Sequence, residues 1–360
     1  MRFAFTDEQL ALREGAREVL EGTCTLADVR ALFDSGNPLS GRSNERWDAL
    51  VALGAQSLLA SEDLGGLGFG DGELVGVVEE AGRVCLPEAL AHHAGVAIPV
   101  LMRVPSALES VAAINAAGSQ ISVGGIDAAL SGPVVTWFEG NATAARVRGV
   151  ARAGSFLLAS AGQEGLELSL VDAHDVVITP TPTLDVAADL GAVTWTPSRE
   201  NRVAQGQDAV VLIDDLASRL ALYSAAELCG AVEAMLAMTA RYAIDRQQFG
   251  APIGSFQAVK HLLADVRVAL EFARPALYRA AWSMANDDAS KHHDAALAKA
   301  LASELGDTAA AACLQVHGGI GYTWENDLQF FLKRCWSLAK AHGDAPTQRA
   351  RALTLGLESL

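Results

Sequence analysis

The chain has 360 residues, of which 51% are apolar and 19% charged, and 27 Lys and Arg against 43 Asp and Glu leave a formal net charge of −16. The high apolar fraction excludes disorder over most of the chain and suffices for a large core in two or three structural domains, or in one composite unit. A sequence pI near 4.9, with no local basic stripe, argues against nucleic acid as a partner.

Residues 1 to about 117 show the apolar spacing that is typical of helices. Thr6 is expected to cap the first helix, and the charged side chains of that helix exclude a secretory leader. The glycine-rich stretch 64–72 lacks the GxGxxG spacing and follows a helical segment. We therefore expect it to link two helices and not to bind a dinucleotide.

From about 118 to 205 the pattern changes to short apolar runs separated by Gly, Pro, Asn and Asp. Such runs, rich in β-branched and aromatic residues, predict a small antiparallel sheet or barrel. The expected strands are 134–138, 156–159, 166–171, 176–179 and 192–196.

Long helical patterns return after this middle region. The segment 216–246 carries small and apolar residues on nearly every face, which is typical of a helix buried between other helices. A helix of this length spans about 45 Å, enough to cross a bundle and reach a neighbouring subunit. The predicted fold class is α+β, mainly α, with a helical domain at 1–117, a β-sheet or barrel domain at 118–205 and a helical bundle at 206–360.

Several classes of site are not expected. The five cysteines are scattered without a CxxC pair, which predicts reduced, mostly buried thiols in a cytoplasmic protein. The histidine pairs 92–93 and 292–293 are adjacent and would point about 100° apart on a helix, so we expect no metal site. The sequence contains no stretch of 18 or more uncharged apolar residues, so we expect no membrane span.

Two segments in the last third carry the functional signal. Residues 241–261, RYAIDRQQFGAPIGSFQAVKH, predict a helix that ends at Gly250 and a new helix near Ser255, so that Arg246 would lie beside a helix N-terminus and attract an anion. Residues 315–325, QVHGGIGYTWE, predict a helix running into two glycines, where a pyrophosphate or a nucleotide edge could approach the backbone. From the residues alone, ordinary helix ends explain both segments equally well.

The motifs RQQFG, IGSFQ and QVHGGIGYTWE resemble the C-terminal signature of the acyl-CoA dehydrogenase family. FTDEQ at 5–9 and the stretch 59–70 extend the resemblance toward the N-terminus. The resemblance implies the acyl-CoA dehydrogenase fold, with an N-terminal helical domain, a small middle β domain and a C-terminal four-helix bundle. It further implies FAD as cofactor, α,β-dehydrogenation of an acyl-CoA thioester as activity, and an electron-transfer flavoprotein as electron acceptor.

The same resemblance implies six contacts to the FAD of a neighbouring subunit, across a dimer interface. Those expected at the pyrophosphate are Arg246, Phe249 and Gln257. Those expected at the adenosine half are Gln315, Gly318 and Gly319.

The chain departs from the family at the catalytic base. Family chemistry needs a carboxylate to remove the α proton. One family group carries it shortly before a Gln-Arg, where this chain has His342, and the other on the long helix, where this chain has Leu220. Glu227, two turns further on the same face, is a candidate for a displaced base, and a buried carboxylate satisfied by its neighbours is the alternative. His342 could accept a proton near pH 7.

The chain departs from the family a second time at the flavin ring. The family's loop of the form Thr-Glu-Pro-Gly-x-Gly-Ser-Asp should precede the strands, and the matching region 134–144 keeps only Thr136, Glu139 and Gly140. The Trp-x-Thr/Ser element that flanks the flavin is missing from 145–154. The sequence thus keeps the residues that reach a partner's FAD and lacks those that hold its own.

We therefore expect a subunit of a heteromeric FAD-dependent acyl-CoA dehydrogenase, active only with a second acyl-CoA dehydrogenase chain in a heterotetramer. Heteromers of this kind in actinobacteria act on the CoA thioesters of steroid side chains, which gives the expected substrate class. Two alternatives stay open: a homo-oligomeric dehydrogenase with an unusual base, and a non-catalytic scaffold member of the family.

Overall fold

The computed structural model describes residues 5–35, 43–127, 132–162 and 165–358. Its first part is helical, and the helices α1 to α6 are Asp7–Thr23, Leu26–Ser35, Asn44–Ala52, Asp71–Arg83, Ile98–Leu101 and Leu108–Ala117, with a π-helical segment at Ala91–Ala97 before α5. The predicted cap of α1 is confirmed, because the Thr6 hydroxyl accepts from the Gln9 backbone N–H at 3.2 Å.

The middle region forms two packed sheets of four strands each, in the orders β1-β6-β7-β10 and β4-β5-β9-β8. The strands β1 and β4 to β10 are Gln120–Gly124, Val135–Phe138, Asn141–Arg148, Ala153–Gly162, Gly165–Asp172, Val176–Pro180, Leu190–Trp195 and Arg202–Gln205. A short pair, β2 (Ile126–Asp127) and β3 (Gly132–Pro133), lies between β1 and β4. Side chains alternate along β6, so that Phe156 packs between the sheets whereas Leu157 joins the main helical core.

Each of the five expected strands overlaps a strand of the structure, namely β4, β6, β7, β8 and β9, but the prediction was incomplete. β1, β5 and β10 were not predicted, and β1 pairs with β6 in parallel, so the region is not purely antiparallel. β5 reads Asn-Ala-Thr-Ala-Ala-Arg-Val-Arg, in which alanines and arginines weaken the β pattern. Its buried positions are Ala142, Ala144, Val147 and Arg148, and of these only Val147 carries a strong apolar signal.

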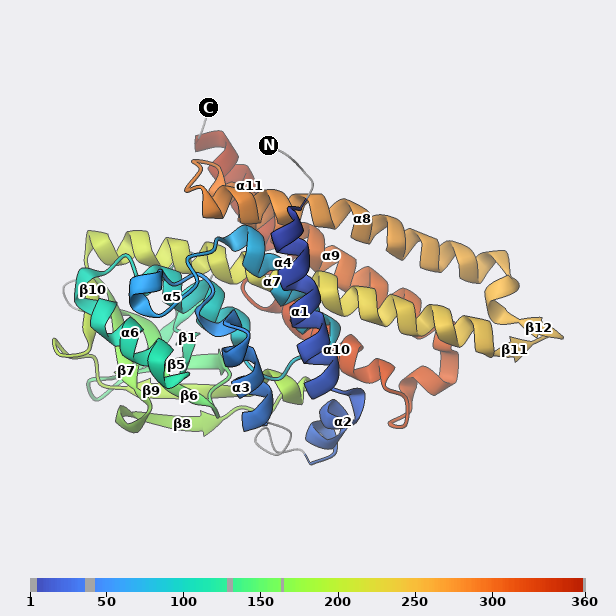
Figure 1. The fold of residues 1–360 in the computed structure, drawn as a ribbon, viewed down its shortest axis with the longest axis horizontal. Helices are drawn as coiled ribbons and strands as arrows, with labels where there is room; N and C mark the ends of the chain where they lie inside the picture. Colours follow the sequence, from blue (N-terminus) through green and yellow to red (C-terminus); the bar gives the residue numbers. More distant parts are fainter. Residues whose placement is uncertain (1–4, 36–42, 128–131, 163–164, 359–360) are drawn as a thin grey trace.

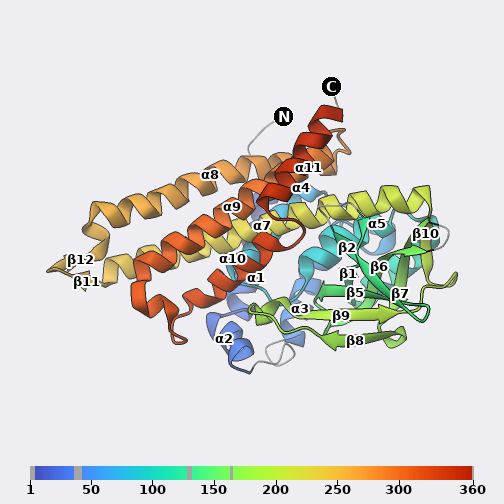
Figure 2. The ribbon, with the colours of Figure 1, turned by 180° about the vertical axis from the view of Figure 1, so that it is seen from behind.

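The last part is a bundle of long helices. Its helices α7 to α11 are Gln207–Asp245, Gln257–Ala285, Lys291–His317, Leu328–Lys340 and Ala345–Glu358, and a two-strand hairpin, β11 (Gln247–Gln248) and β12 (Ala251–Pro252), follows α7. In Figures 1 and 2, α7, α8 and α9 run side by side along the longest axis, with the sheets beside one end of α7 and the hairpin at the opposite tip. The order of helical domain, small β domain and helical bundle confirms the predicted fold class.

Helix α7 crosses α4 at backbone contact. A Cβ atom added to Gly230 would lie 1.8 Å from the carbonyl oxygen of Glu79, and one added to Gly82 would lie 2.1 Å from that of Glu227. Both glycines are helical and buried, so glycine is required here by the close approach of two helix backbones and not by the φ angle.

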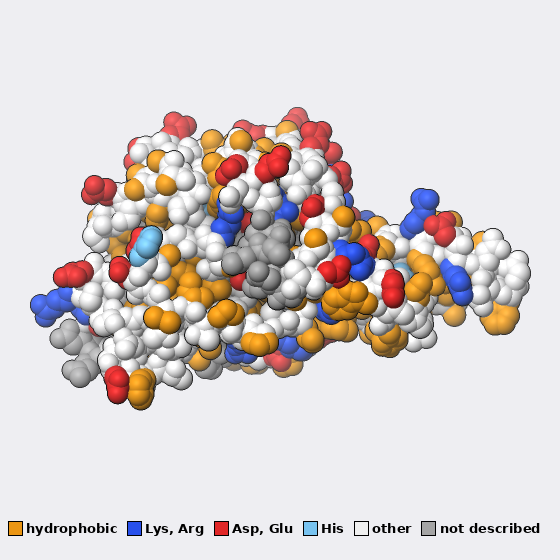
Figure 3. All heavy atoms as spheres, turned by 90° about the horizontal axis from the view of Figure 1, so that it is seen from below, with side chains coloured by type: hydrophobic (Ala, Val, Ile, Leu, Met, Phe, Trp, Pro, Cys, Tyr) orange, Lys and Arg blue, Asp and Glu red, His pale blue; other side chains and the backbone are white. Residues whose placement is uncertain are grey.

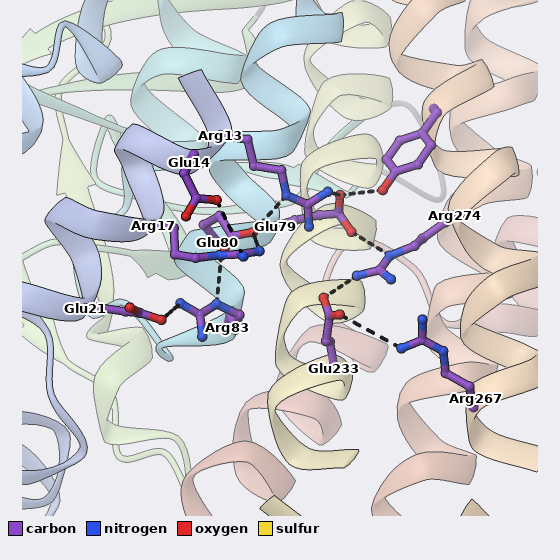
Figure 4. A network of polar contacts seen from close by, with 11 residues as sticks. Arg13, Glu14, Arg17, Glu21, Glu79, Glu80, Arg83, Glu233, Arg267 and Arg274 are labelled. Atoms are coloured by element: carbon purple, nitrogen blue, oxygen red, sulfur yellow. Dashed lines mark hydrogen bonds and ion pairs between the residues drawn. The ribbon is translucent and has the colours of Figure 1, made fainter. Parts of the chain in front are cut away.

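Buried carboxylates next to this crossing are surrounded by arginines from other helices (Figure 4). Arg13 of α1 donates to Glu80 of α4 at 2.8 Å, and Arg274 of α8 donates to Glu79 at 3.1 Å and also pairs with Glu233 of α7. Burial alone would raise the pKa of Glu80, but hydrogen bonds from arginines lower it to about 2. This network joins α1, α4, α7 and α8 around the crossing.

The close α4–α7 crossing predicts that adding one methyl group at Gly230 lowers the free energy of unfolding. Gly230→Ala is expected to cost about 1–3 kcal/mol, because the methyl would force α4 and α7 apart. Gly22→Ala, on α1 with nothing within 4 Å of the added Cβ, should be stabilising by about 0.5 kcal/mol. Urea unfolding followed by circular dichroism measures both, and equal midpoints for the two variants would contradict the tight crossing.

Candidate cofactor-binding tip and base positions

The first motif forms the tip of the bundle. α7 ends at Asp245, with Arg246 as its C-terminal cap, and the hairpin reverses the chain at Phe249 and Gly250, whose φ angles are +54° and +77°. The helix therefore does not run to Gly250 as predicted, because residues 247–252 pair as strands and α8 begins only at Gln257. A non-glycine residue with positive φ is uncommon.

The three residues expected at the pyrophosphate are all exposed there. Arg246, Phe249 and Gln257 face solvent, and Phe249 is 95% exposed. The Arg246 guanidinium forms no ion pair or hydrogen bond with the described part of the chain. Its backbone is held on both sides, since its N–H donates to the Tyr242 carbonyl and its carbonyl accepts from the Ile253 N–H, both at 2.8 Å.

The second motif ends α9 near the same end of the bundle. Gly318 has a φ of +62°, and the short helical turn η8, Gly318–Tyr322, follows it. A Cβ atom added to Gly318 or Gly319 would meet nothing within 4 Å, so the backbone is open to approach. Gln315 is exposed on the last turn of α9.

An aromatic stack joins the two motifs. The rings of Tyr242 in α7 and His317 in α9 lie 4.4 Å apart and nearly parallel, and the Tyr242 hydroxyl is 3.5 Å from the His317 carbonyl oxygen. Burial lowers the pKa of His317, opposed by its contact with the Cys313 carbonyl, so the ring is neutral at pH 7. The sequence analysis missed both residues, although each lies within a motif that it singled out.

A mainly apolar hollow of about 410 Å³ lies between the end of α7 and the start of α8. Ala243, Ile244 and Val259 are among its lining residues, and Lys260 is the charged residue that lines it. Figure 3 shows this end of the bundle projecting beyond the body, with apolar, basic and acidic side chains along it.

The candidate base positions give a different picture. Leu220 is buried in α7 and has no proton-accepting group. Glu227 is 4% exposed, and both its oxygens accept from Arg148 of β5, at 2.9 and 2.8 Å, while Arg334 of α10 lies 3.6 Å away. Arg334 itself pairs with Asp185 at 2.7 Å. This arrangement agrees with the alternative to a displaced base, in which Glu227 is a buried carboxylate satisfied by its neighbours.

His342 is not tuned to accept a proton near pH 7, a possibility that the sequence had left open. Burial and the positive charges of Lys299 and Arg148 lower its pKa to about 3. Its ring packs 5.5 Å from that of His92, and its carbonyl accepts from Gln348 at 2.6 Å. The imidazole is therefore neutral at pH 7 and a weak base.

Residues 134–144, which correspond in position to the family's flavin-ring loop, form a β-hairpin. Thr136 lies in β4 and pairs with Thr143 of β5, and Glu139 and Gly140 form the turn with φ of +48° and +84°. A hairpin of this kind does not offer the loop that the family motif describes. The chain between β1 and β4 includes 128–131, outside the described residues.

Three expected absences can be compared with the described residues. Among them, no group of three or more His, Cys, Asp or Glu side chains is placed to hold a metal ion. The five cysteines are free and buried. Among the described helices, α7 is long and apolar enough to cross a membrane by length and composition, and 78% of its most apolar window is buried inside the structure.

Comparison with known proteins identifies the family. Residues 6–107 match the acyl-CoA dehydrogenase N-terminal domain and residues 217–352 the C-terminal domain. The chain is 30% identical to the acyl-CoA dehydrogenase IpdE2 of Mycobacterium tuberculosis, over 94% of this chain and 92% of that protein. It is 33% identical to the acyl-CoA dehydrogenase FadE34 of the same organism over 94% of this chain, which spans 45% of FadE34.

Two solved structures extend the comparison. The ChsE4–ChsE5 complex from Mycobacterium tuberculosis superposes with a TM-score of 0.86 and 27% identity, covering all of both chains. The Tcur3481–Tcur3483 steroid acyl-CoA dehydrogenase gives a TM-score of 0.83 and 25% identity, covering 98% of both. The protein belongs to the acyl-CoA dehydrogenase family, whose members are FAD-dependent flavoproteins and oxidoreductases.

The residues at the tip fit part of an FAD molecule. Arg246 offers an unpaired guanidinium fork for a pyrophosphate, the open backbone at Gly318 and Gly319 admits a nucleotide edge, and the apolar hollow accepts a flat ring. Arg246 and Gly319, and with them Phe249 at the tip, face outward.

A buried lysine holds the loop that carries His342. Lys299 Nζ donates to Ser303 Oγ at 2.7 Å and to the Gly343 carbonyl at 3.1 Å, and it is fully buried. Burial lowers the pKa of Lys299 to about 7 from an ordinary value of 10.5. Folding therefore disfavours the charged amine, and the resulting loss of stability grows as the pH falls from 10.5 to 7.

Lys299→Met should reveal this cost as a pH dependence. Because the unfolded chain binds more protons than the folded one between pH 7 and 10.5, wild-type stability should rise relative to the variant by about 1 kcal/mol per pH unit in that range. Urea unfolding at pH 7, 8 and 9 measures the difference. Lys340→Met, at an exposed ion pair with Asp307, should show no such slope, and a flat Lys299→Met difference would contradict the neutral buried amine.

Proposed function

We propose that this chain is one subunit of a heteromeric FAD-dependent acyl-CoA dehydrogenase, which catalyses α,β-dehydrogenation of an acyl-CoA thioester together with a second acyl-CoA dehydrogenase chain. One observation carries the proposal. The cofactor motifs project outward from the tip with an unpaired Arg246, whereas the base positions hold Leu220 and a weakly basic His342. The chain offers contacts to a neighbour's cofactor and no free carboxylate at either position.

In this proposal the work is divided between the subunits. FAD, when bound, would supply the hydride acceptor for the β hydrogen, and the second chain would contribute the carboxylate that removes the α proton. Arg246 binds the pyrophosphate, Phe249 and Gln257 complete that contact, and Gln315, Gly318 and Gly319 hold the adenosine half. The neutral Tyr242–His317 stack keeps the two sets of contacts at a fixed separation.

The similar proteins support a substrate class and a kind of partner. One of the similar structures is a steroid acyl-CoA dehydrogenase, and another is the ChsE4–ChsE5 complex. We extend both features to this chain, with a CoA thioester of a steroid side chain as substrate, a heterotetramer as the assembly and an electron-transfer flavoprotein as electron acceptor.

Co-expression with the neighbouring reading frame tests the division of labour. The chain alone should purify with little FAD, and the co-purified assembly should contain one FAD per pair of chains, measured as flavin absorbance against protein concentration. A chain that alone carries a full complement of FAD and dehydrogenates acyl-CoA would contradict the proposal.

Arg246→Ala in the co-expressed assembly should weaken FAD binding by about 2 kcal/mol, since a charge-assisted contact to the pyrophosphate is lost. Arg241→Ala is the matched control, because Arg241 lies one turn earlier on α7, is exposed and pairs locally with Asp245. The rate of FAD release on dilution measures both variants. Equal rates would show that Arg246 does not touch the cofactor.

Glu227→Gln separates the proposal from a homo-oligomeric enzyme with an unusual base. The variant should lose about 3 kcal/mol of stability, because Arg148 and Arg334 stay buried with less countercharge. Turnover per folded, FAD-loaded assembly should not change. Loss of turnover with FAD still bound would instead identify Glu227 as the base.

A further inference from the structure

Helix α2 holds the segment that follows η8 through a single arginine. Arg30 donates from Nε to Asp327 Oδ1 at 3.1 Å, from one terminal nitrogen to the Trp324 carbonyl at 2.9 Å and from the other to the Glu325 carbonyl at 3.0 Å. Arg30 and Asp327 are 297 positions apart in the chain. All donor nitrogens of the guanidinium fork are thus used on one short loop.

A second contact fixes the same loop through its tryptophan. The Trp324 indole N–H donates to Asp34 Oδ1 of α2 at 2.6 Å. The Lys333 amine lies 4.5 Å from the Trp324 ring and 5.0 Å from that of Phe33. The α2 contacts therefore hold both the backbone and the side chain of residue 324, although half of that side chain is exposed.

The held segment continues directly into the turn that carries the open glycines. The Thr323 backbone N–H and hydroxyl donate to the Ile320 carbonyl at 3.1 and 2.9 Å. Gly318 and Gly319 have no neighbour within 4 Å of an added Cβ, so little packing at these positions restrains them. The path of the glycine backbone is set by His317 on one side and by the loop 323–327 on the other.

We propose that Arg30 and Asp34 are positioning residues for the cofactor contact at Gly318 and Gly319. This inference rests on the proposed function, because it assigns to α2 the task of holding the η8 turn in the conformation that receives the adenosine half of a partner's FAD. A loop that is ordered before binding does not lose that conformational freedom when the cofactor arrives, so its affinity is higher.

Two substitutions of Asp34 provide the test, because both remove the charge and only one removes the acceptor. Asp34→Ala breaks the bond to the Trp324 indole, whereas Asp34→Asn keeps an oxygen that can accept it. In hydrogen exchange on the full chain, Asp34→Ala should speed exchange of the amides at 318–325 by about tenfold, and Asp34→Asn should stay near wild type.

The same variants are then measured for FAD release from the co-expressed assembly. Asp34→Ala should release FAD about tenfold faster than Asp34→Asn. Arg30→Lys should resemble Asp34→Ala and not wild type, because one ammonium cannot serve three acceptors. Arg267→Ala removes a positive charge at an exposed ion pair of α8 and should leave exchange at 318–325 unchanged.

The outcomes separate this inference from the function on which it rests. Unchanged exchange in Asp34→Ala overturns the positioning role even if Arg246→Ala weakens FAD binding. Faster exchange with unchanged FAD release also overturns it, and leaves the proposed function standing. If the wild-type assembly holds no FAD, the proposed function fails and the positioning role fails with it.

Discussion

The backbone contact between α4 and α7 is the constraint on which the rest of the structure depends. Because Gly230 and Gly82 leave no side chains in the crossing, α7 is fixed directly against the N-terminal domain. The 39-residue helix then extends from the sheets to the far end of the bundle. Its rigidity carries Arg246 and the hairpin beyond the body, where a separate molecule can reach them.

The charges in the interior leave neither Glu227 nor His342 suited to remove a proton from a substrate. Arg148 pairs with Glu227 at 2.8 Å, and Arg334, also near Glu227, pairs with Asp185 at 2.7 Å, so the charge of Glu227 is compensated where it lies. Burial, together with the positive charges of Lys299 and Arg148, lowers the pKa of His342 and keeps its ring neutral. The weakly basic His342 and the ion-paired Glu227 suit a packed interior. Proton abstraction instead requires a free base that can reach the substrate.

Apolar patterns were enough to predict the order of helices, sheet and helices, the residue type at position 6 predicted the cap, and the resemblance to the family marked the two motifs at the tip. The patterns could not predict β5, two of whose four buried residues are alanines, nor the end of α7 at Asp245, because the hairpin forms through pairing of Gln247 with Pro252. The Arg30 contacts also escaped them, since partners nearly 300 residues apart become neighbours only after folding. Sequence patterns reveal the periodicity of apolar residues along a short segment, whereas β5, the hairpin and the Arg30 contacts depend on tertiary contacts.

The hairpin turn has a consequence for how the chain behaves by itself. Phe249 is 95% exposed, at a backbone conformation that disfavours a bulky residue, and Ile244 and Tyr322 at the same end are also largely exposed. Such apolar surface in water promotes self-association. If the proposed heteromer forms, a chain made in excess over the second subunit would be prone to aggregate at this end, and balanced synthesis of the two chains would limit that loss.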